Sequence, residues 1–504
     1  MTEEVKILQL NRETMISKLE GILALEHNWV GIGERPWTDE NFLREINNKW
    51  DLSFLAMRRD EIVGYSIGFE SNPGVAYFGK VVVDKNYRGM GIGKKLLTEF
   101  EKKCADLGLS GIHFKSQIPN NTANKMYTEA GYHIVGHTMG DDRINRYDFF
   151  KALKTATSTI KHSKPTLDVE YRQGIEDLLK GGRLADGSMV TSFEQTLEDY
   201  LGSKVILTNS GSNALLLGLK ALGVKEGDEV IVPPYMCMSV LQSVIHTGAK
   251  PIFADINHDD FNISKKGLEE KISKNTKAII AAHMFGIPIK DFDQLRQYST
   301  PVIEDCAQCF GADYDGRKIG AMGEMAILSF YATKLLTTGR GGALVTKNED
   351  TYQKAKKLMT TDESDKFILG HSFQMDDLHA YLGIQQFKRL PEFIKKRREI
   401  AAFYRQVLQD TAHQNMFLRR FDENNLFYRY IVLVDDPERV ANKLKLFGVE
   451  AKKPIYKPLH QLLCLNESIM NTDLAHKYAL SLPIYPLLNK EDAKFVAKAF
   501  LASN

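Results

Sequence analysis

Two residues that end separate strand-like runs could together perform carbonyl–amine chemistry. Residues 302–305 (VIED) end in Asp305, and residues 329–334 (SFYATK) end in Lys334. A lysine amine can condense with an aldehyde, and a carboxylate can hold a pyridine nitrogen protonated so that the ring accepts electrons. Because open α/β sheets bind ligands at the carboxyl ends of their strands, we expect both side chains to serve one site.

A phosphate-binding turn is predicted for the same site. Residues 208–216 (TNSGSNALL) follow a strand and open a helix, so Ser210, Gly211 and Ser212 place hydroxyls and amides at a helix N-terminus. Taken alone, a lysine is usually solvated and an acid at a strand end often caps a helix. The order of carboxylate, lysine and phosphate cradle, followed by the glycine-rich turn at 338–342 (TGRGG), instead indicates pyridoxal phosphate.

A second glycine-rich turn lies nearer the N-terminus. Residues 81–97 (VVVDKNYRGMGIGKKLL) read as a strand, a turn containing Gly89, Gly91 and Gly93, and an amphipathic helix. Such a turn lets backbone amides approach a phosphate closely. Glycines at this spacing could also mark a tight turn or a dinucleotide fingerprint. A whole layer of strands precedes the run and no acidic ribose ligand ends a following strand, which argues against a dinucleotide.

The elements that position these residues divide the chain into four segments. Residues 1–152 read as short strands and amphipathic helices, and residues 153–167 read as a linker that is small, polar and basic. Residues 168–390 alternate helical segments with strand-like runs, which predicts a mostly parallel sheet in an α/β domain. Residues 391–504 begin with a long charged helix and continue as a small α+β domain. The strand-like runs are 205–208, 229–233, 277–283 and 301–305.

The composition excludes several classes of protein. The 504 residues are 43% hydrophobic and 26% charged, as in an ordinary globular chain, and a net charge of +2 predicts neither a nucleic-acid nor a membrane partner. Cys306 and Cys309 form a C-x-x-C pair, but no second pair accompanies it and no metal is expected. The first residues lack the pattern of a signal peptide and no apolar run approaches about 20 residues, so we expect a cytoplasmic protein.

Residues 1–152 resemble the GCN5-related N-acetyltransferase (GNAT) family. Arg88, Gly91 and Gly93 match its R/Q-x-x-G-x-G/A motif, and residues 120–132 (NNTANKMYTEAGY) match its N-x-x-A-x-x-x-Y-x-x-x-G-[FY] signature. The resemblance implies an acetyl-CoA site with Tyr127 as the general acid for the leaving thiolate, although a tyrosine here could simply pack under the following turn. It names no general base. The implied cofactor contacts are backbone groups near Val81 and Val83, the pyrophosphate loop 88–94 with Arg88, Gly89, Gly91, Gly93 and Lys94, and Asn120.

Residues 165–504 closely resemble the DegT/DnrJ/EryC1/StrS family of sugar aminotransferases. Matching pieces include residues 210–233, 303–320 (IEDCAQCFGADYDGRKIG) and 481–486 (SLPIYP). The resemblance implies a fold-type-I homodimer with active sites at the subunit interface. Lys334 then binds pyridoxal phosphate as a Schiff base and shuttles protons, and Asp305 pairs with the ring nitrogen. Gln308 lies near the ring, and Ser210, Gly211, Ser212 and Ser329 bind the phosphate.

This sequence departs from that family at three places. Cys237 stands where an aromatic residue usually covers the ring, which leaves Tyr235 as a possible substitute. The usual G-E-G-G reads GRGG at 339–342, and the usual phosphate-binding Asn from the neighbouring subunit is replaced by Ser372. Some relatives carry histidine in place of the lysine and become dehydratases, but Lys334 argues against that reaction.

The two resemblances predict a bifunctional enzyme. The second half would transfer an amino group, with glutamate as the expected donor, to a keto group on a nucleotide-linked deoxysugar. The first half would then acetylate the new amine from acetyl-CoA, because acetyl transfer requires a nucleophilic amine. Two alternatives stay open: the GNAT domain acetylates an unrelated amine, or it is a non-catalytic acetyl-CoA sensor or docking module.

Overall fold

The computed structural model describes residues 4–29, 36–182, 184–185, 187–359, 369–408, 424–465 and 467–504. The chain divides into two compact units. The N-terminal unit comprises Met1–Ile160 with Glu438–Val449 and Phe495–Asn504, and the larger unit comprises Lys161–Pro437 with Glu450–Lys494. The segment 153–167, which we expect to be a linker, crosses from one unit to the other.

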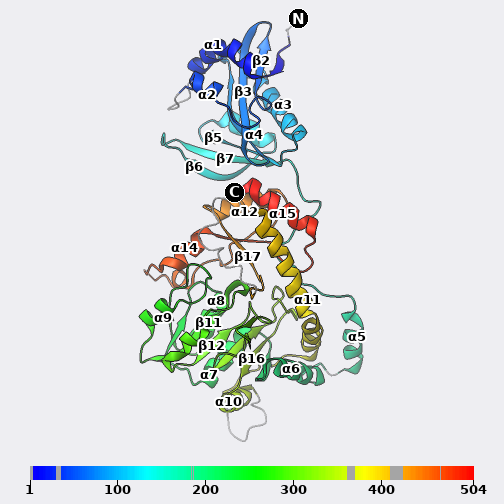
Figure 1. Ribbon diagram of the computed structural model, residues 1–504, viewed down its shortest axis with the longest axis vertical. Helices are drawn as coiled ribbons and strands as arrows, with labels where there is room; N and C mark the ends of the chain where they lie inside the picture. Colours follow the sequence, from blue (N-terminus) through cyan, green and yellow to red (C-terminus); the bar gives the residue numbers. More distant parts are fainter. Residues whose placement is uncertain are drawn as a thin grey trace. The chain divides into compact units, whose positions relative to one another are not determined.

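A seven-stranded sheet forms the centre of the N-terminal unit (Figure 1). Phe54 and Ala56 of β2 pack in the core beneath α3, whereas the alternate residues Leu55 and Met57 pack in the core beneath α1. Helices therefore cover both faces of the sheet. The strands, in the order β1-β2-β3-β4-β5-β7-β6, are β1 (Lys6–Gln9), β2 (Phe54–Arg58), β3 (Glu61–Asn72), β4 (Val75–Val83), β5 (Gly111–Gln117), β7 (Asn145–Ala152) and β6 (His133–Met139). The helices are α1 (Arg12–Trp29), α2 (Asp39–Leu43), α3 (Ile92–Asp106) and α4 (Asn121–Glu129).

The two parallel strands of this sheet, β4 and β5, separate along their length. They pair only from Val75 opposite Gly111 to Tyr77 opposite His113. Beyond that point β4 stays paired with β3 as far as Val83, and within the described part of the chain no ladder joins it to β5. The β5-facing edge of β4 near Val81 and Val83, here called the free edge, lies beside the turn that leads into α3.

A second seven-stranded sheet forms the centre of the larger unit (Figure 1). It is mostly parallel, as predicted, with β16 running antiparallel to both of its neighbours. Side chains that alternate along each strand fill two separate cores, so helices cover both faces. The strands, in spatial order, are β10 (Lys250–Phe253), β9 (Glu229–Val232), β11 (Thr276–Ala282), β12 (Val302–Asp305), β15 (Met325–Ser329), β16 (Gly342–Thr346) and β8 (Lys204–Thr208).

The register of this sheet brings the predicted site residues to one edge. Thr208 at the end of β8 pairs with Gly342 at the start of β16, and Gly342 pairs in turn with Ser329 at the end of β15. Asp305 ends β12, the next strand along. The loops that follow β8, β12 and β15 therefore leave the sheet together.

Helix α11 (Asp377–Leu408) is continuous through Pro391 and so spans the domain limit predicted between residues 390 and 391, which stays a prediction. A proline inside a helix removes one backbone hydrogen bond. The buried side chains of Leu390, Phe393 and Ile394 on the same turn anchor the helix there and offset that loss.

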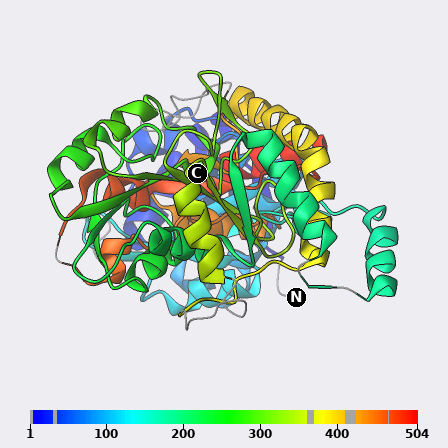
Figure 2. The same ribbon diagram turned by 90° about the horizontal axis from the view of Figure 1, so that it is seen from below.

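The remaining elements surround this sheet. Helix α5 (Tyr171–Gly181) lies at the edge of the larger unit beside α11 (Figure 2). The others of this unit are α6 (Ser188–Leu201), α7 (Gly211–Ala221), α8 (Met238–Ile245), α9 (Lys265–Lys271), α10 (Glu349–Met359), α13 (Leu459–Leu462), α14 (Met470–Tyr478), and the strand pairs β13 (Asp313–Tyr314) with β14 (Arg317–Lys318) and β17 (Tyr430–Leu433) with β18 (Ala479–Leu482). Helices α12 (Pro437–Leu446) and α15 (Lys490–Ser503) lie mostly within Glu438–Val449 and Phe495–Asn504, the later segments of the N-terminal unit.

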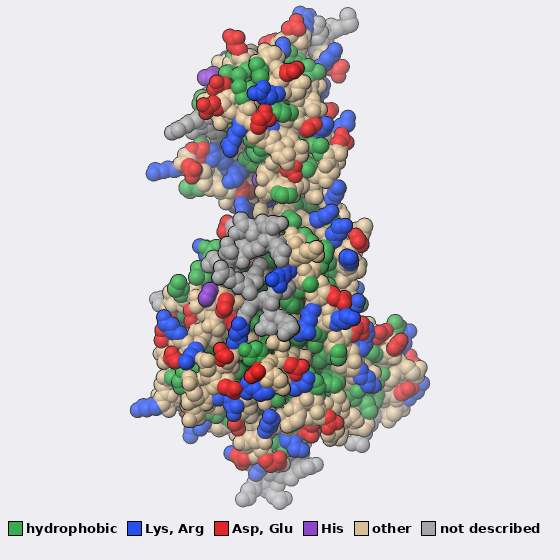
Figure 3. Space-filling model, viewed as in Figure 1, with side chains coloured by type: hydrophobic (Ala, Val, Ile, Leu, Met, Phe, Trp, Pro, Cys, Tyr) green, Lys and Arg blue, Asp and Glu red, His purple; other side chains and the backbone are tan. Residues whose placement is uncertain are grey.

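The surface carries both signs of charge. Lys and Arg side chains are interspersed with Asp and Glu over the face of the larger unit that Figure 3 shows, in line with the small net charge. Among the helices that the structure describes, none is both long and apolar enough to cross a bilayer.

Candidate active sites

A cavity of about 370 Å³ opens at the edge of the larger sheet where the predicted residues meet. It draws its walls from the ends of β8, β12 and β15, from the start of β16 and from the N-termini of α7 and α8. Lys334 and Asp305 both line it. The other lining residues are Asn209, Ser210, Gly211, Ser212, Leu215, Cys237, Ser239, Val240, Ala307, Ile327, Ser329, Tyr331, Arg340 and Gly341.

One end of this cavity is built to receive an anion. The side chain of Ser210 caps α7 by accepting a hydrogen bond from the Asn213 amide at 3.1 Å, which leaves the first amides of the helix facing the cavity. The strand pairing also presses Gly342 against this turn, where a Cβ atom would lie 2.4 Å from the Gly211 nitrogen. A Cβ on Gly211 would lie 2.9 Å from that of Ser329. Because Gly211 and Gly342 have no side chains, β16 and β15 can approach the N-terminus of α7 this closely.

Asp305 provides a half-buried carboxylate that lines the cavity. Its Oδ1 accepts a hydrogen bond from the Ala307 amide at 2.9 Å. Burial raises the pKa of this carboxyl, and the positive charge of Lys334 opposes that rise. A buried carboxylate is stabilised by a cationic hydrogen-bond donor, which is what a protonated ring nitrogen would supply.

Lys334 lies in the turn after β15, where its amide donates to the Tyr331 carbonyl at 2.8 Å. Its Nζ atom lies 5.1 Å from the centre of the Tyr428 ring. Amine, carboxylate and anion cradle thus share a cavity that small molecules can enter. Their donor types and arrangement fit pyridoxal phosphate, with Lys334 at the aldehyde, Asp305 at the ring nitrogen and α7 at the phosphate.

Three of the other predicted cofactor residues point elsewhere. Tyr235 is fully buried, stacks on Phe261 and donates to the Ala475 carbonyl at 3.4 Å, so it does not line the cavity. Gln308 accepts from the Phe285 amide at 3.0 Å. Ser372 is exposed and donates to the side chain of Gln374. Their roles toward the cofactor stay predictions.

Cys237 does line the cavity, at the N-cap of α8 with its Sγ 3.1 Å from the Ser239 oxygen. Sequence reasoning did not name Ser239, Tyr331, Arg340 or Asn209 as contacts. Asn209 and Arg340 lie inside motifs that were recognised, so nearness to a motif could have identified them. Tyr428 lies 94 positions from Lys334 in the sequence, and no local pattern marks it.

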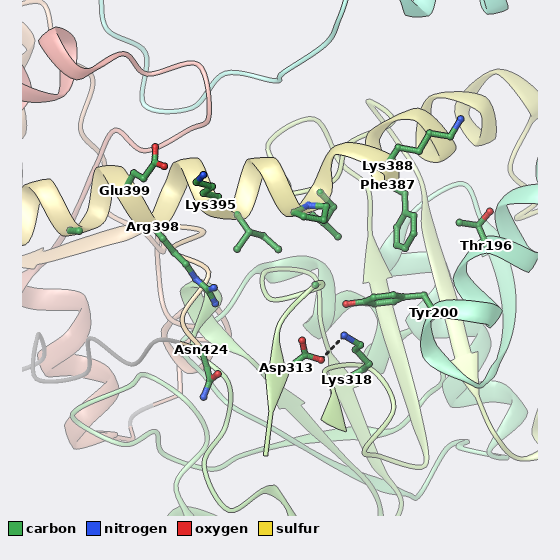
Figure 4. A pocket seen from close by; sticks show the side chains of 15 residues that line it. Thr196, Tyr200, Asp313, Lys318, Phe387, Lys388, Lys395, Arg398, Glu399 and Asn424 are labelled. Atoms are coloured by element: carbon green, nitrogen blue, oxygen red, sulfur yellow. Dashed lines mark ion pairs between the residues drawn. The ribbon is translucent and has the colours of Figure 1, made fainter. Parts of the chain in front are cut away.

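A larger groove of about 1270 Å³ lies on another side of the larger unit and contains none of the predicted residues. Lys395 and Arg398 of α11, Tyr200 of α6 and the ion pair between Asp313 and Lys318 line it (Figure 4). It has neither an amine beside a buried carboxylate nor an anion cradle of backbone amides. The smaller cavity is therefore the candidate active site of this unit.

The glycine-rich turn of the N-terminal unit leads into α3 as expected. Gly89 and Gly91 have φ angles of 79° and 78°, a left-handed conformation that glycine adopts without strain, and Gly91 caps the helix. Gly93 lies in the first turn, where a Cβ would meet ordinary contacts. Arg88 donates from Nε to the carbonyl of Val83 at 3.2 Å, which fixes the turn against the free edge of β4. The first amides of α3 are thus positioned for a phosphate.

The remaining predicted residues of this unit lie on or beside these elements. Val81 lies on the free part of β4, and the Lys94 side chain is exposed on α3. Asn120 caps α4, its Oδ1 accepting from the Ala123 amide at 3.3 Å. Tyr127 is 4% exposed and packs against Phe114. Burial raises the pKa of the Tyr127 phenol, so it keeps its proton at neutral pH.

The comparisons with known proteins match the two units separately. The model of the DegT/DnrJ/EryC1/StrS aminotransferase family matches residues 165–501, about two thirds of the chain. The chain belongs to this family. The model of the acetyltransferase (GNAT) family matches residues 22–132, so a GNAT domain precedes the aminotransferase. Both predicted resemblances are confirmed.

Curated members of the aminotransferase family match nearly along their whole length. The UDP-4-amino-4,6-dideoxy-N-acetyl-beta-L-altrosamine transaminase of Campylobacter jejuni is 31% identical and covers 67% of this chain and 95% of its own. The spore coat polysaccharide biosynthesis protein SpsC of Bacillus subtilis is also 31% identical, over 68% of this chain and 96% of its own.

Solved structures of this family share the fold of the larger unit. The aminotransferase TlmJ of Streptoalloteichus hindustanus superimposes with a TM-score of 0.65 at 27% identity and covers 69% of this chain and 99% of its own. Helicobacter pylori PseC gives a TM-score of 0.63 at 24% identity and covers 69% of this chain and 99% of its own. The predicted α/β fold of an aminotransferase preceded by a GNAT domain is confirmed.

Proposed function

We propose that the larger unit transfers an amino group from glutamate to a keto group on a nucleotide-linked deoxysugar, using pyridoxal phosphate. The observation that carries this proposal is the single cavity lined by Lys334, Asp305 and the N-terminus of α7. Relatives named as transaminases or synthases of UDP- and GDP-linked amino sugars support the substrate class. The resemblance to this family further supports a homodimer.

Lys334, Asp305 and the phosphate cradle each have a task in the proposed reaction. The bound cofactor supplies an electron sink that stabilises the carbanion of the amino-group carrier. Lys334 would hold the cofactor through its amine and would move a proton to and from the substrate carbon. Asp305 would keep the ring nitrogen protonated, and the amides of α7 with Ser329 would hold the phosphate and orient the cofactor.

We propose further that the GNAT domain acetylates the amine so produced. The match to the acetyltransferase family, the turn at residues 88–94 and the free edge of β4 support acetyl-CoA binding. Tyr127 would protonate the departing thiolate. The order of reactions follows from chemistry, because the ketosugar has no amine to acetylate before transamination.

The competing functions of the GNAT domain are acetylation of an unrelated amine and acetyl-CoA sensing without catalysis. Arg88, Gly91, Gly93 and Tyr127 form a complete set of the family's motif residues, which favours catalysis over sensing.

One experiment separates these functions. The full-length protein is supplied with candidate nucleotide-linked ketosugars, glutamate and acetyl-CoA, and the products are followed by mass. We expect a product carrying both the new nitrogen and an acetyl group. An aminated sugar that never gains acetyl would contradict the joined reaction. Loss of the visible absorbance of bound cofactor in Lys334→Ala tests the aminotransferase chemistry separately.

A further inference from the structure

Tyr428 is a buried tyrosine that neither the sequence motifs nor the proposed reaction uses. It lies just before β17, is 5% exposed, and brings its ring to within 5.1 Å of the Lys334 Nζ atom. The Arg429 guanidinium lies 4.6 Å from the same ring. An aromatic ring attracts cations over its face, and the attraction grows when water is excluded.

The phenol oxygen of Tyr428 is held by two polar neighbours. Arg429 Nη2 donates to it at 3.3 Å, and Thr333, the residue before Lys334, lies within hydrogen-bond distance at 3.2 Å from its Oγ1. Either oxygen of the Tyr428–Thr333 pair can be the donor, and a hydrogen bond donated by Thr333 would stabilise the phenolate. The phenol is thereby tied to the turn that carries Lys334.

Within the described residues, the charged groups that act on the Tyr428 phenol are all cations. Lys334 follows β15, Arg429 is the adjacent residue, and Arg397 of α11 donates to the Tyr428 carbonyl at 3.3 Å. Burial alone would raise the pKa of Tyr428, but Lys334, Arg429, the Thr333 hydrogen bond and Arg397 outweigh it and lower that pKa to about 8. Asp305 provides the balancing negative charge near Lys334.

We propose that Tyr428 is a positioning residue for Lys334, holding the charged amine over its ring and controlling through its phenol oxygen how readily that amine gives up its proton. The inference rests on the proposed role of Lys334 in binding the cofactor. Coupling between two titrating groups is reciprocal. If the Lys334 ammonium stabilises the Tyr428 phenolate, the phenolate stabilises the ammonium to the same extent.

The first test measures the phenol directly. The ultraviolet absorbance of tyrosinate is followed against pH in the full-length protein. We expect one tyrosine to ionise near pH 8, at the lowered pKa of Tyr428. Tyr428→Phe should abolish this transition, and Lys334→Met should move it upward by roughly one pH unit or more, because the cation that lowers the Tyr428 pKa most is gone. Lys334→Gln provides a second neutral variant.

The matched control removes another buried phenol of the same unit. Tyr404 of α11 is fully buried and donates to the Pro483 carbonyl at 2.9 Å. Tyr404→Phe should leave the transition near pH 8 in place. A transition that survives Tyr428→Phe, or that neither neutral variant of Lys334 moves, overturns the proposal. This titration needs no cofactor, so its outcome does not depend on the proposed function.

The second test measures the effect on Lys334. Capture of pyridoxal phosphate by the full-length protein requires the neutral amine, so its rate rises with pH. In Tyr428→Phe the phenolate can no longer stabilise the ammonium, and the rate profile should move to lower pH by about half a unit to one unit. An unchanged profile would make Tyr428 a packing residue and overturn the proposal. Failure of the unsubstituted protein to capture cofactor would instead contradict the proposed function.

Discussion

At the scale of single residues, Tyr127 combines the requirements of a packed tyrosine with those of an acid. Its ring belongs to an aromatic cluster with Phe114, Tyr132 and Phe149. Burial raises the pKa of the phenol, which suits a group that must hold its proton until the thiolate leaves. Packing and catalysis therefore do not exclude one another at this position.

Tyr127→Phe separates the two roles because it keeps the ring and removes the proton. We expect acetyl transfer to slow by about 10²-fold, within the range typical of general acids, while the unfolding temperature changes little. Steady-state rates with acetyl-CoA measure this. Tyr132→Phe is the matched control, since it removes another buried phenol of the same aromatic cluster and should leave the rate unchanged. Equal rates in Tyr127→Phe and the unsubstituted protein would leave Tyr127 a packing residue only.

Glu304 precedes Asp305 on β12. Asp305 lines the cavity, whereas the Glu304 carboxylate is hydrogen-bonded inside the protein. Its two carboxylate oxygens accept from the amides of Gly320, Met322 and Gly323, and from His283 at 3.3 Å. Burial opposes the charge, but these hydrogen bonds and His283 outweigh it and lower the pKa of Glu304. The carboxylate therefore ties loop 320–323 to the strand that carries Asp305.

A stability measurement tests this tie. A carboxyl whose pKa is lowered in the folded state stabilises the protein above its unfolded pKa and loses that effect as pH falls through the folded value. Glu304→Gln should reduce the free energy of unfolding by about 1 to 3 kcal/mol at neutral pH. The difference from the unsubstituted protein should shrink in acid, as measured by denaturant unfolding at several pH values. A difference independent of pH would show that the charge contributes nothing.

At the scale of elements, the phosphate cradle depends on how closely β16 approaches the N-terminus of α7. The pairing of Gly342 with Thr208 and Ser329 sets this approach, and a Cβ at Gly342 would lie 2.4 Å from the Gly211 nitrogen. Such a contact requires the backbone to move. The amides that should hold the phosphate would then lose their alignment.

Gly342→Ala should therefore weaken pyridoxal phosphate binding by roughly tenfold or more, since one lost charge-assisted hydrogen bond is worth that much. Equilibrium titration of the visible absorbance measures the affinity. Gly181→Ala, at the end of α5 where a Cβ meets nothing within 4 Å, is the control and should bind normally. If both variants bind equally well, the close approach has no part in holding the cofactor.

The elements also show why part of the site could be predicted from sequence. Asp305, Lys334 and the 210–212 turn each end or follow an apolar run, and parallel strands bring such ends to a common edge. Tyr428 could not be assigned in this way, because its nearness to Lys334 depends on tertiary packing. For the same reason, sequence could not show that Tyr235 and Gln308 direct their polar atoms toward Ala475 and Phe285.

At the scale of the whole molecule, the two compact units are not two consecutive stretches of chain. Glu438–Val449 and Phe495–Asn504 group with the N-terminal unit, although both lie within the region that matches the aminotransferase family. Cutting the chain at residues 153–167 would therefore separate segments that belong to one unit. Point substitutions that silence one site at a time are the better way to ask how the two reactions are connected.

Mixing two singly inactive proteins tests whether the amine passes between the sites through solution. Lys334→Ala supplies an intact GNAT domain, and a variant with Arg88→Ala and Tyr127→Phe supplies an intact aminotransferase cavity. We expect the mixture to form the acetylated amino sugar after a lag that shortens as the protein concentration rises, because tethering alone raises only the effective concentration of the second site. Product mass over time measures this. Alone, Lys334→Ala should leave the ketosugar unchanged, and the variant with Arg88→Ala and Tyr127→Phe should stop at the free amine. If the mixture accumulates only the free amine while the unsubstituted protein acetylates it, the amine is transferred within one molecule. If the unsubstituted protein also leaves the amine free, the acceptor of the GNAT domain is a different molecule.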